Sequence, residues 1–294
     1  MYAITGISGK VGGALAASLL QAGLPVRAVL RNPANAAAWI ARGCDVAIAD
    51  MTDADALARA FTGADGVFIL PPSEFDPRPG FPEARAVIDA VTSAIALGQP
   101  AKVVCLSTIG AQSDQQNLLT QRTLMEQALR RLPLPVTLLR PGWFMENLAW
   151  DVASTRDQGV IDSYLQPLER AIPMVATADV GRVGAQLLRE DWTGLRVVEL
   201  EGPQRVSPLD AARAFAEVLG RSVAVRAVPR ERWGALFTAQ GMRDPIPRIQ
   251  MLDGFNEGWI DFEGPRDRII KGQVALVDVV RALTTAVSRN ADAA

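Results

Sequence analysis

Histidine is absent from the chain of 294 residues, and this absence excludes several kinds of active site. Without histidine there is no Ser-His-Asp or Cys-His nucleophile system, no His-ligated metal and no histidine proton shuttle. The chain has only two cysteines, Cys44 and Cys105, which are too few for a four-ligand zinc site. We expect both to be structural thiols and no metal to be bound, so the chemistry has to come from other side chains or from an organic cofactor.

The sequence also lacks a large excess of positive or negative charge and long hydrophobic runs. Lys+Arg 30 against Asp+Glu 32 gives a net charge of -2, which lacks the basic excess that nucleic acid binding needs. No run of about 18 apolar residues is present, and no signal peptide precedes the first apolar segment, which begins at Tyr2. We therefore expect a cytoplasmic protein without a nucleic acid or membrane partner that acts on a small molecule. Whether the chain forms a homodimer stays open.

Short apolar runs alternate with longer stretches of helical periodicity over the first two-thirds of the chain. Because parallel strands need right-handed crossovers, this alternation predicts an α/β fold with a doubly wound parallel sheet of the Rossmann type, and ligands at the carboxyl ends of its strands. The predicted strands comprise residues 2–4, 26–30, 46–49, 67–70, 103–106 and 136–139. The predicted helices comprise residues 11–22, 34–42, 54–61, 83–97 and 115–131.

After Arg140 the alternation is replaced by longer loops with aromatic residues, which indicates a small C-terminal substrate lobe. Further strands are predicted at residues 172–175 and 197–200, and further helices at 180–188 and 208–219, the last with Ser207 as its N-cap. The expected division is a dinucleotide-binding domain of residues 1–142 and 174–195 and a substrate lobe of residues 143–173 and 196–271. Residues 272–294 are expected to form a C-terminal helix and a frayed tail.

The strongest local motif is the glycine-rich segment of residues 5–13, TGISGKVGG, which follows the first predicted strand and opens the first helix. In such a turn Gly6 would permit the tight bend, Gly9 would let backbone N–H groups approach a pyrophosphate, and Gly12 would let the helix pack closely on the strand. A glycine-rich turn without a ligand is the alternative. The position inside an N-terminal βαβ unit favours dinucleotide binding.

Two side chains at the ends of the next strands are candidates for recognising the nucleotide. Arg31 follows the second strand, where an acidic residue would favour NAD and a guanidinium favours the 2′-phosphate of NADP. A solvated arginine is the alternative interpretation. Asp50 closes the third strand and is placed to meet the adenine, or else to cap the following helix.

Several segments together resemble the NmrA-like, atypical branch of the short-chain dehydrogenase/reductase family. They are the glycine turn, the run of residues 136–147 (VTLLRPGWFMEN) and parts of residues 201–233. The glycine turn is shared by many proteins, whereas residues 137–147 are much more specific. The resemblance implies an NADP(H)-binding Rossmann domain with a small C-terminal lobe, in a family whose members are NADPH-dependent reductases or cofactor sensors.

The sequence departs from the main branch of short-chain reductases in its catalytic motif. That branch carries Tyr-x-x-x-Lys, in which the lysine lowers the pKa of the phenol and the tyrosine protonates the reduced carbonyl. This chain has only Tyr2 and Tyr164, and neither has a lysine four residues later. By alignment with the family the tyrosine place falls at Leu118 and the lysine place at Arg122, whose guanidinium keeps a positive charge without exchanging protons. Arg122 is therefore predicted to position or stabilise the acceptor; a solvated helix arginine is the alternative.

Ser107 and Thr108 follow the fifth strand, where the resemblance and the carboxyl-end rule both place the nicotinamide. With Arg122 they form the predicted catalytic set, and hydroxyls bonded to their own backbone are the alternative. The predicted cofactor contacts are Gly6, Ser8, Gly9, Lys10, Val11, Gly12, Arg31, Asp50, Met51, Leu70, Pro71, Pro72, Pro141, Gly142 and Trp143. The predicted substrate contacts are Trp143, Phe144, Tyr164 and Phe255, in an aromatic group with Trp150 and Trp233 that could equally be lobe core.

These residues favour hydride transfer from NADP(H) to an acceptor that needs no strong enzymic acid, such as a quinone, an iminium, a cationic dye-like molecule or an enone. A second interpretation is a redox sensor that binds NADP(H) without turnover, which the missing Tyr-x-x-x-Lys motif supports. A third is a non-redox cyclase or isomerase on the same fold.

Overall fold

An eight-stranded parallel sheet lies at the centre of the protein in the computed structural model, which describes residues 1–292. Within that range the strand order is β12-β10-β6-β5-β4-β1-β2-β3, and every neighbouring pair is parallel. The strands are β1 (Tyr2–Ile4), β2 (Val26–Leu30), β3 (Asp45–Ile48), β4 (Gly66–Ile69), β5 (Val103–Leu106), β6 (Val136–Pro141), β10 (Leu195–Glu201) and β12 (Ile270–Lys271). The predicted doubly wound parallel sheet is confirmed.

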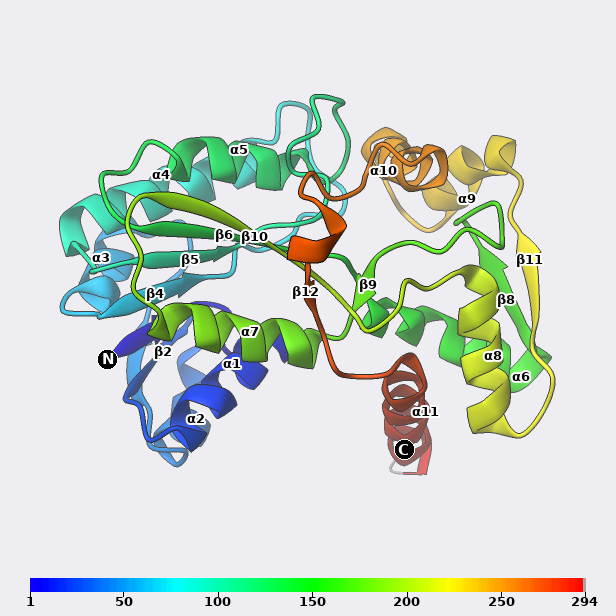
Figure 1. Ribbon diagram of the computed structural model, residues 1–294, viewed down its shortest axis with the longest axis horizontal. Helices are drawn as coiled ribbons and strands as arrows, with labels where there is room; N and C mark the ends of the chain where they lie inside the picture. Colours follow the sequence, from blue (N-terminus) through cyan, green and yellow to red (C-terminus); the bar gives the residue numbers. More distant parts are fainter. Residues whose placement is uncertain (293–294) are drawn as a thin grey trace.

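Helices cover both faces of this sheet (Figure 1). One face carries α3 (Ala54–Phe61), α4 (Pro82–Gly98) and α5 (Thr120–Leu129), and the other carries α1 (Lys10–Gln21), α2 (Ala36–Ile40) and α7 (Thr177–Arg189). Leu57, Val91 and Leu129 are buried in the first core, and Leu15 and Val183 in the second. Since all four residues of β4 and of β5 are buried, their continuous apolar sequences are those of strands covered on both faces.

The strand order reverses between β1 and β4. The chain runs outward from β1 to β2 and β3, returns to pair β4 with β1, and then continues outward on the other side through β5 and β6. In open parallel sheets this switch point is where ligands bind, at the carboxyl ends of the strands. The fold therefore brings the glycine turn after β1 next to the loop after β4.

A smaller lobe stands beside the sheet. It contains β7 (Trp143–Phe144), η2 (Met145–Asp151), α6 (Val152–Gln158), β8 (Val160–Ser163), β9 (Met174–Val175), α8 (Pro208–Leu219), β11 (Ala224–Ala227), η3 (Arg230–Arg232), α9 (Trp233–Ala239), α10 (Ile246–Glu257) and α11 (Leu276–Asp292). One core of the lobe surrounds Trp233, Phe237 and Phe255, and another surrounds Phe215 and Val280. Ser207 caps α8 as predicted, in a reciprocal capping box with Asp210.

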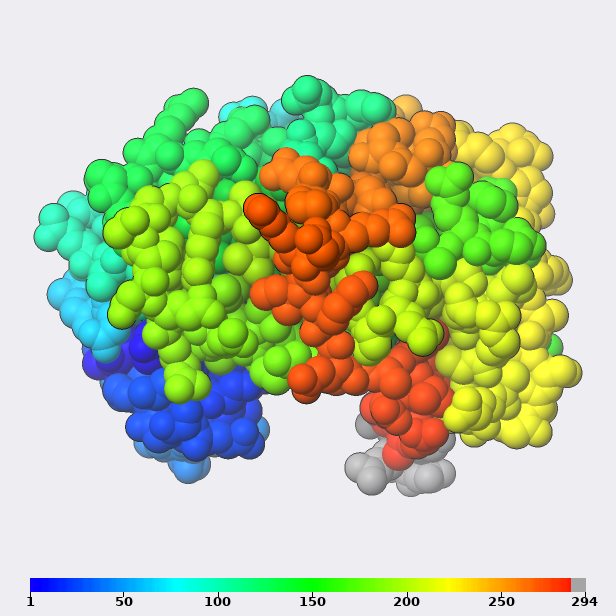
Figure 2. All heavy atoms as spheres, viewed as in Figure 1, coloured from blue at the N-terminus to red at the C-terminus, as the bar shows by residue number. Residues whose placement is uncertain are grey.

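The path of the chain between sheet and lobe differs from the expected boundaries. Residues 196–271 were assigned to the lobe, yet β10 pairs with β6 and β12 pairs with β10 inside the main sheet. The chain leaves the sheet after β10, builds α8 to α10, returns for β12 through η4 (Arg266–Arg268), and leaves again to form α11 beside α8. Figure 2 shows the returning segment, in orange, lying across the surface between the two parts. The rest of the domain division stays a prediction.

Some predicted elements are shorter or shifted. The helix expected at residues 115–131 begins only at Thr120, because the Asn117 side chain accepts a hydrogen bond from the Leu119 N–H and the Asn117 N–H donates to Thr120 Oγ1. The helix expected at 34–42 is split into η1 (Pro33–Asn35) and α2. Only residues 174–175 of the strand expected at 172–175 pair as β9. Of the expected frayed tail, residues 293–294 lie outside the described residues.

Close packing of α7 on α1 generates a prediction about stability. A Cβ atom at Gly181 would lie 2.6 Å from Ala14 Cβ and 2.7 Å from Leu15 N, so Gly181→Ala forces the two helices apart. We expect a loss of about 1–3 kcal/mol in the free energy of unfolding, measured by urea denaturation. Gly234→Ala in α9 is the control, since the nearest atom to its Cβ would be 4.0 Å away. Equal effects of both substitutions would contradict the packing argument.

Candidate active site

The glycine turn forms a backbone cradle at the carboxyl end of β1. Gly6 adopts a φ of +62°, and the Gly9 N–H donates to the Gly6 carbonyl at 3.0 Å, which closes the turn. A Cβ at Gly12 would lie 2.4 Å from the Gly6 carbonyl oxygen, so only glycine lets the first turn of α1 approach so closely. Gly9 is the N-cap of α1 and has no side chain to satisfy the first-turn N–H groups. The cradle therefore has the donors and the space that a diphosphate requires.

Residues of β4 complete the switch point. The Thr5 hydroxyl donates to the Phe68 carbonyl and accepts from the Leu70 N–H at 2.8 Å, which joins the ends of β1 and β4. Ser8 and Lys10 are exposed beside the turn, whereas the Val11 side chain is buried in the core and offers a ligand only its backbone. The structure thus brings the predicted glycine-turn residues and Leu70 together.

Arg31 is exposed after β2, and no residue among 1–292 forms a hydrogen bond or an ion pair with it. Asp50 accepts hydrogen bonds from the Thr52 hydroxyl at 2.7 Å and the Thr52 N–H at 2.9 Å, which lower its pKa, with a smaller contribution from the charge of Arg31. The cap of α3 is Asp53, whose side chain accepts from the Ala56 N–H, so Asp50 does not cap that helix. Met51 lies partly buried beside Asp50.

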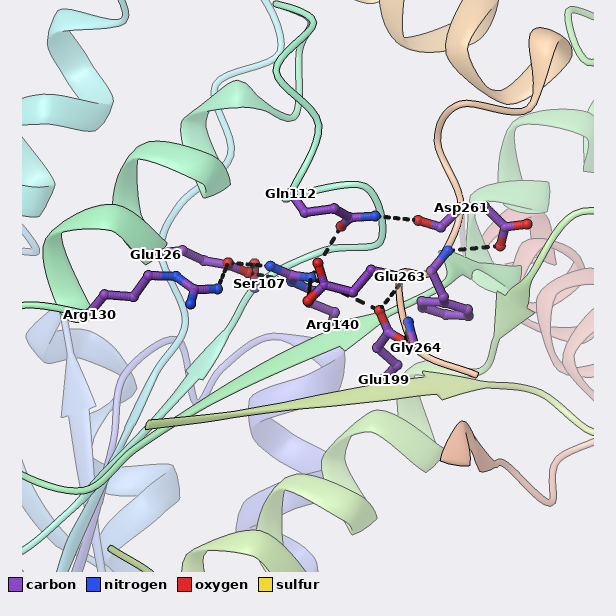
Figure 3. Close-up of polar contacts among 10 residues, drawn as sticks. Ser107, Gln112, Glu126, Arg130, Arg140, Glu199, Asp261, Glu263 and Gly264 are labelled. Carbon is purple, nitrogen blue, oxygen red and sulfur yellow. Dashed lines mark hydrogen bonds and ion pairs between the residues drawn. The ribbon is translucent and has the colours of Figure 1, made fainter. Parts of the chain in front are cut away.

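Ser107 takes part in a buried charged network that the sequence did not reveal (Figure 3). Its hydroxyl donates to Glu126 Oε1, and Glu126 in turn forms a two-point ion pair with Arg140, at 2.8 Å and 2.7 Å. Arg140 is 1% exposed and Glu126 3%. Burial opposes ionisation of Glu126, but the hydrogen bonds from Arg140 and Ser107 outweigh it and lower the pKa of Glu126. The carboxylate stays charged and keeps the Ser107 proton pointed at α5.

The same network reaches the segment that returns from the lobe. Arg140 contacts Gln112 Oε1 at 3.2 Å and Glu263 Oε1 at 3.0 Å, and Gln112 Nε2 donates to the Asp261 carbonyl. The Glu199 carboxylate accepts from the Glu263 and Gly264 N–H groups at 2.9 Å and 3.0 Å. These contacts, drawn in Figure 3, fix residues 261–264 against β6 and β10.

Thr108 and Arg122 have different surroundings from those of Ser107. Thr108 is partly buried, and its hydroxyl has no hydrogen-bond partner in the described part of the chain. Arg122 donates to the Pro71 and Pro72 carbonyls and to the Ser73 hydroxyl, at 2.8, 3.2 and 2.7 Å. Burial lowers the pKa of Arg122. Arg122 is therefore not a solvated helix arginine: it holds the loop after β4, which contains the predicted cofactor contacts Pro71 and Pro72.

A second set of contacts holds the other end of this loop to the lobe. Asp76 accepts hydrogen bonds from Arg243 Nε at 2.8 Å, the Arg243 N–H and the Asp244 N–H, which lower its pKa to about 2. On the sheet side, the Gln121 side chain donates to the Glu74 carbonyl. No sequence spacing indicated these contacts, because Asp76 and Arg243 are 167 positions apart.

The predicted aromatic group divides between core and surface. Phe255 and Trp233 are buried in the lobe core, and Trp143 packs on Phe255 in an edge-on contact with ring centroids 5.0 Å apart. Tyr164 packs on Trp233 and Phe237 at 5.8 Å and 5.0 Å. Phe144 packs against the sheet core, and Trp150 is 65% exposed. Pro141 and Gly142 are buried between β6 and the segment before β9, where a Cβ at Gly142 would lie 2.6 Å from the Pro173 carbonyl.

Residues 1–292 contain neither a metal-binding cluster nor a membrane-spanning helix. No group of three or more cysteine, aspartate or glutamate side chains has the arrangement of a metal site. No helix in that range is long and apolar enough to cross a membrane.

The doubly wound sheet and the glycine turn at its switch point are those of the Rossmann class. Within that class the chain belongs to the NmrA-like family, whose family model matches residues 2–254. The resemblance inferred from the glycine turn and residues 136–147 is therefore confirmed.

Two curated relatives cover most of the chain. It is 28% identical over 260 residues to an NAD(P)H azoreductase of Xenophilus azovorans, with 87% of this chain and 85% of that protein aligned. It is 26% identical over 248 residues to quinone oxidoreductase 2 of Escherichia coli strain K12, with 84% of each aligned.

Solved structures with this fold also match nearly full length. An NADPH-dependent quinone oxidoreductase of Escherichia coli, complexed with NADPH, gives a TM-score of 0.78 at 25% identity and covers 96% of this chain and 99% of its own. The triphenylmethane reductase of Citrobacter sp., complexed with NADP(H), gives a TM-score of 0.79 at 20% identity over 96% and 99%, and this likeness concerns the fold.

The buried ion pair generates a prediction of strong coupling. Arg140→Met or Glu126→Gln alone leaves one buried group without its partner, and each is expected to lower the free energy of unfolding by about 3–5 kcal/mol. The double variant should lose clearly less than the sum of the two, as urea denaturation would show. The exposed pair Arg226 and Asp162 is the control, with a coupling below about 1 kcal/mol. Additive losses at Arg140 and Glu126 would show that the pair is not a unit.

Proposed function

We propose that this chain is an NADPH-dependent oxidoreductase that transfers hydride to a small aromatic or conjugated acceptor of the quinone, azo, iminium or enone type. The observation that carries the proposal is the backbone cradle at the switch point, together with the unpartnered Arg31 at the end of β2. Alignment over most of its length with an NAD(P)H azoreductase and with a quinone oxidoreductase supports it. We also propose a cytoplasmic location, in keeping with the free thiols of Cys44 and Cys105.

The described residues fit NADP(H) in distinct roles. First-turn N–H groups of Lys10, Val11 and Gly12 would bind the diphosphate, and Arg31 would bind the 2′-phosphate in a charge-assisted contact. Asp50 and Met51 would flank the adenine, and Leu70 to Pro72 would lie along the cofactor after β4. Pro141, Gly142 and Trp143 would close the nicotinamide end. NADPH supplies the hydride, which carries two electrons to the acceptor.

The acid required by carbonyl reduction is missing from the site. The tyrosine place is occupied by the buried Leu118, and the Ser107 proton is directed to Glu126, so Ser107 can accept but not donate without breaking that bond. Thr108 is the hydroxyl free to orient an acceptor, while Arg122 acts by holding the loop after β4. The acceptor therefore takes its proton from water. Quinone, azo or conjugated acceptors suit this site better than simple ketones do.

The test of turnover is NADPH oxidation against a panel of quinones, azo compounds, iminium ions, enones and simple ketones. We expect turnover with conjugated acceptors and none with simple ketones. Thr108→Val and Arg122→Met should each lower kcat/KM by one to two orders of magnitude, about 1.4–2.8 kcal/mol, because these groups only orient. Thr92→Val is the control, since the Thr92 hydroxyl bonds to its own helix.

Two other interpretations are distinguished by the same experiment. If no member of the panel oxidises NADPH while NADP(H) binds, the sensor interpretation replaces the reductase. If neither binding nor oxidation occurs, a non-redox cyclase or isomerase remains.

Cofactor preference gives a separate prediction. Arg31→Ala should weaken NADPH binding about tenfold to a hundredfold, because one charge-assisted contact contributes about 1.5–3 kcal/mol to the binding free energy. Binding of NADH, which has no 2′-phosphate, should be unchanged. Calorimetric titration of both cofactors measures this. Arg59→Ala removes another exposed arginine, in α3, and should change neither affinity. An unchanged NADPH preference in Arg31→Ala would identify Arg31 as a bystander.

A further inference from the structure

Arg248 in α10 is a partly buried cation without a carboxylate partner in the part of the chain that the structure describes. Its guanidinium lies over the Phe237 ring, 4.3 Å from the centroid, and 5.9 Å from the centroid of Trp150. Its one hydrogen bond there is donated by Nη1 to Met242 Sδ at 3.8 Å. Burial lowers the pKa of Arg248, opposed only by the nearby Tyr164.

Two other arginines around the lobe, the partly buried Arg205 and the exposed Arg230, are compensated. Arg205 forms ion pairs with Glu201 and Asp261, and Arg230 forms a two-point pair with Asp253 while lying 5.4 Å from the Trp233 ring centroid. Withdrawing a guanidinium from water without a counter-charge costs free energy. Arg248 therefore differs from Arg205 and Arg230 in lacking an anion, although Arg230, like Arg248, lies over an aromatic ring.

The position of Arg248 relates it to the proposed acceptor site. The carbonyl of the adjacent Pro247 accepts a hydrogen bond at 2.9 Å from the N–H of Leu118, the residue at the family's tyrosine place. Further along α10, Phe255 contacts Trp143 of β7, which follows β6. Figure 1 shows α10 beside the loop that leads into α5. Trp150, 65% exposed, offers an accessible aromatic face next to the guanidinium.

We propose that Arg248 is a specificity-determining residue that binds an anionic substituent, a sulfonate or a carboxylate, of an aromatic acceptor. The guanidinium supplies charge-assisted hydrogen bonds to the oxyanion, and Trp150 supplies a face for the aromatic ring. This inference rests on the proposed function and narrows its substrate class. Cationic dye-like acceptors, which the sequence left open, are disfavoured because they bring a like charge to an uncompensated guanidinium.

The test compares naphthoquinone with naphthoquinone sulfonate, which share one ring system and differ in one charge. We expect Arg248→Met, which keeps an apolar stem, to lower the ratio of kcat/KM for the sulfonate over that for the parent quinone about tenfold to a hundredfold. Arg230→Met is the matched control, an arginine over an aromatic ring that already has its carboxylate, and should leave the ratio unchanged. Arg248→Lys should retain part of the ratio, because the charge remains.

Equilibrium binding of naphthalenesulfonate, which accepts no hydride, separates this inference from the proposed function. Fluorescence titration should show binding to the wild type and to Arg230→Met, and about tenfold or greater weakening in Arg248→Met. If both quinones are reduced and neither the ratio nor the titration responds to Arg248→Met, the inference is wrong and the reductase stands. If no quinone is reduced, the reductase fails, and the titration alone decides whether Arg248 binds anions.

Discussion

The ion pair between Arg140 and Glu126 determines how the carboxyl end of the sheet is arranged. It joins β6 to α5 below the surface, orients the Ser107 hydroxyl of the neighbouring strand, and extends through Gln112 and Glu263 to the segment returning from the lobe. An arginine that is 1% exposed can exist there only with several carboxylates around it. The requirement to compensate one buried charge thus places elements from four parts of the chain against each other.

This arrangement has a chemical consequence for the site. Because the pKa of Glu126 is lowered, its carboxylate is a poor proton donor, and it also withdraws the Ser107 proton from the acceptor. Arg122 is engaged with the carbonyls after β4, and Leu118 has no proton to offer. Ser107, Glu126 and Arg122 therefore hold neighbouring parts of the chain in place and offer no proton, which suits the proposed acceptors because they need no proton from the protein.

The sequence indicated local features well and distant contacts poorly. Strand and helix periodicity located β1, β2, β5, α3 and α8, and Ser207 was identified as the N-cap of α8, since each depends on neighbouring residues. Thr120 was missed as a helix start, because Asn117 forms a competing turn through its side chain. β10 and β12 were assigned to the lobe because a strand's own sequence carries little information about which sheet it joins. The sequence did not predict the ion pairs of Glu126 with Arg140 and of Asp76 with Arg243. Nothing in a single sequence relates charges that lie so far apart along the chain.

The repeated passage of the chain between sheet and lobe limits the motions available to the protein. The lobe is built from three stretches of chain, between β6 and α7, between β10 and β12, and after β12, so within residues 1–292 the chain passes between the two parts five times. A clamshell opening about a single hinge would have to break the pairing of β12 and the contacts of residues 261–264 at the same time. The loop between β4 and α4 contacts the lobe through the half-buried Asp76 and the exposed Arg243, so a movement of this loop that admits acceptors of different size would break no strand pairing. Acceptor range in this protein is accordingly a property that loop exchange could alter while the folded frame is retained.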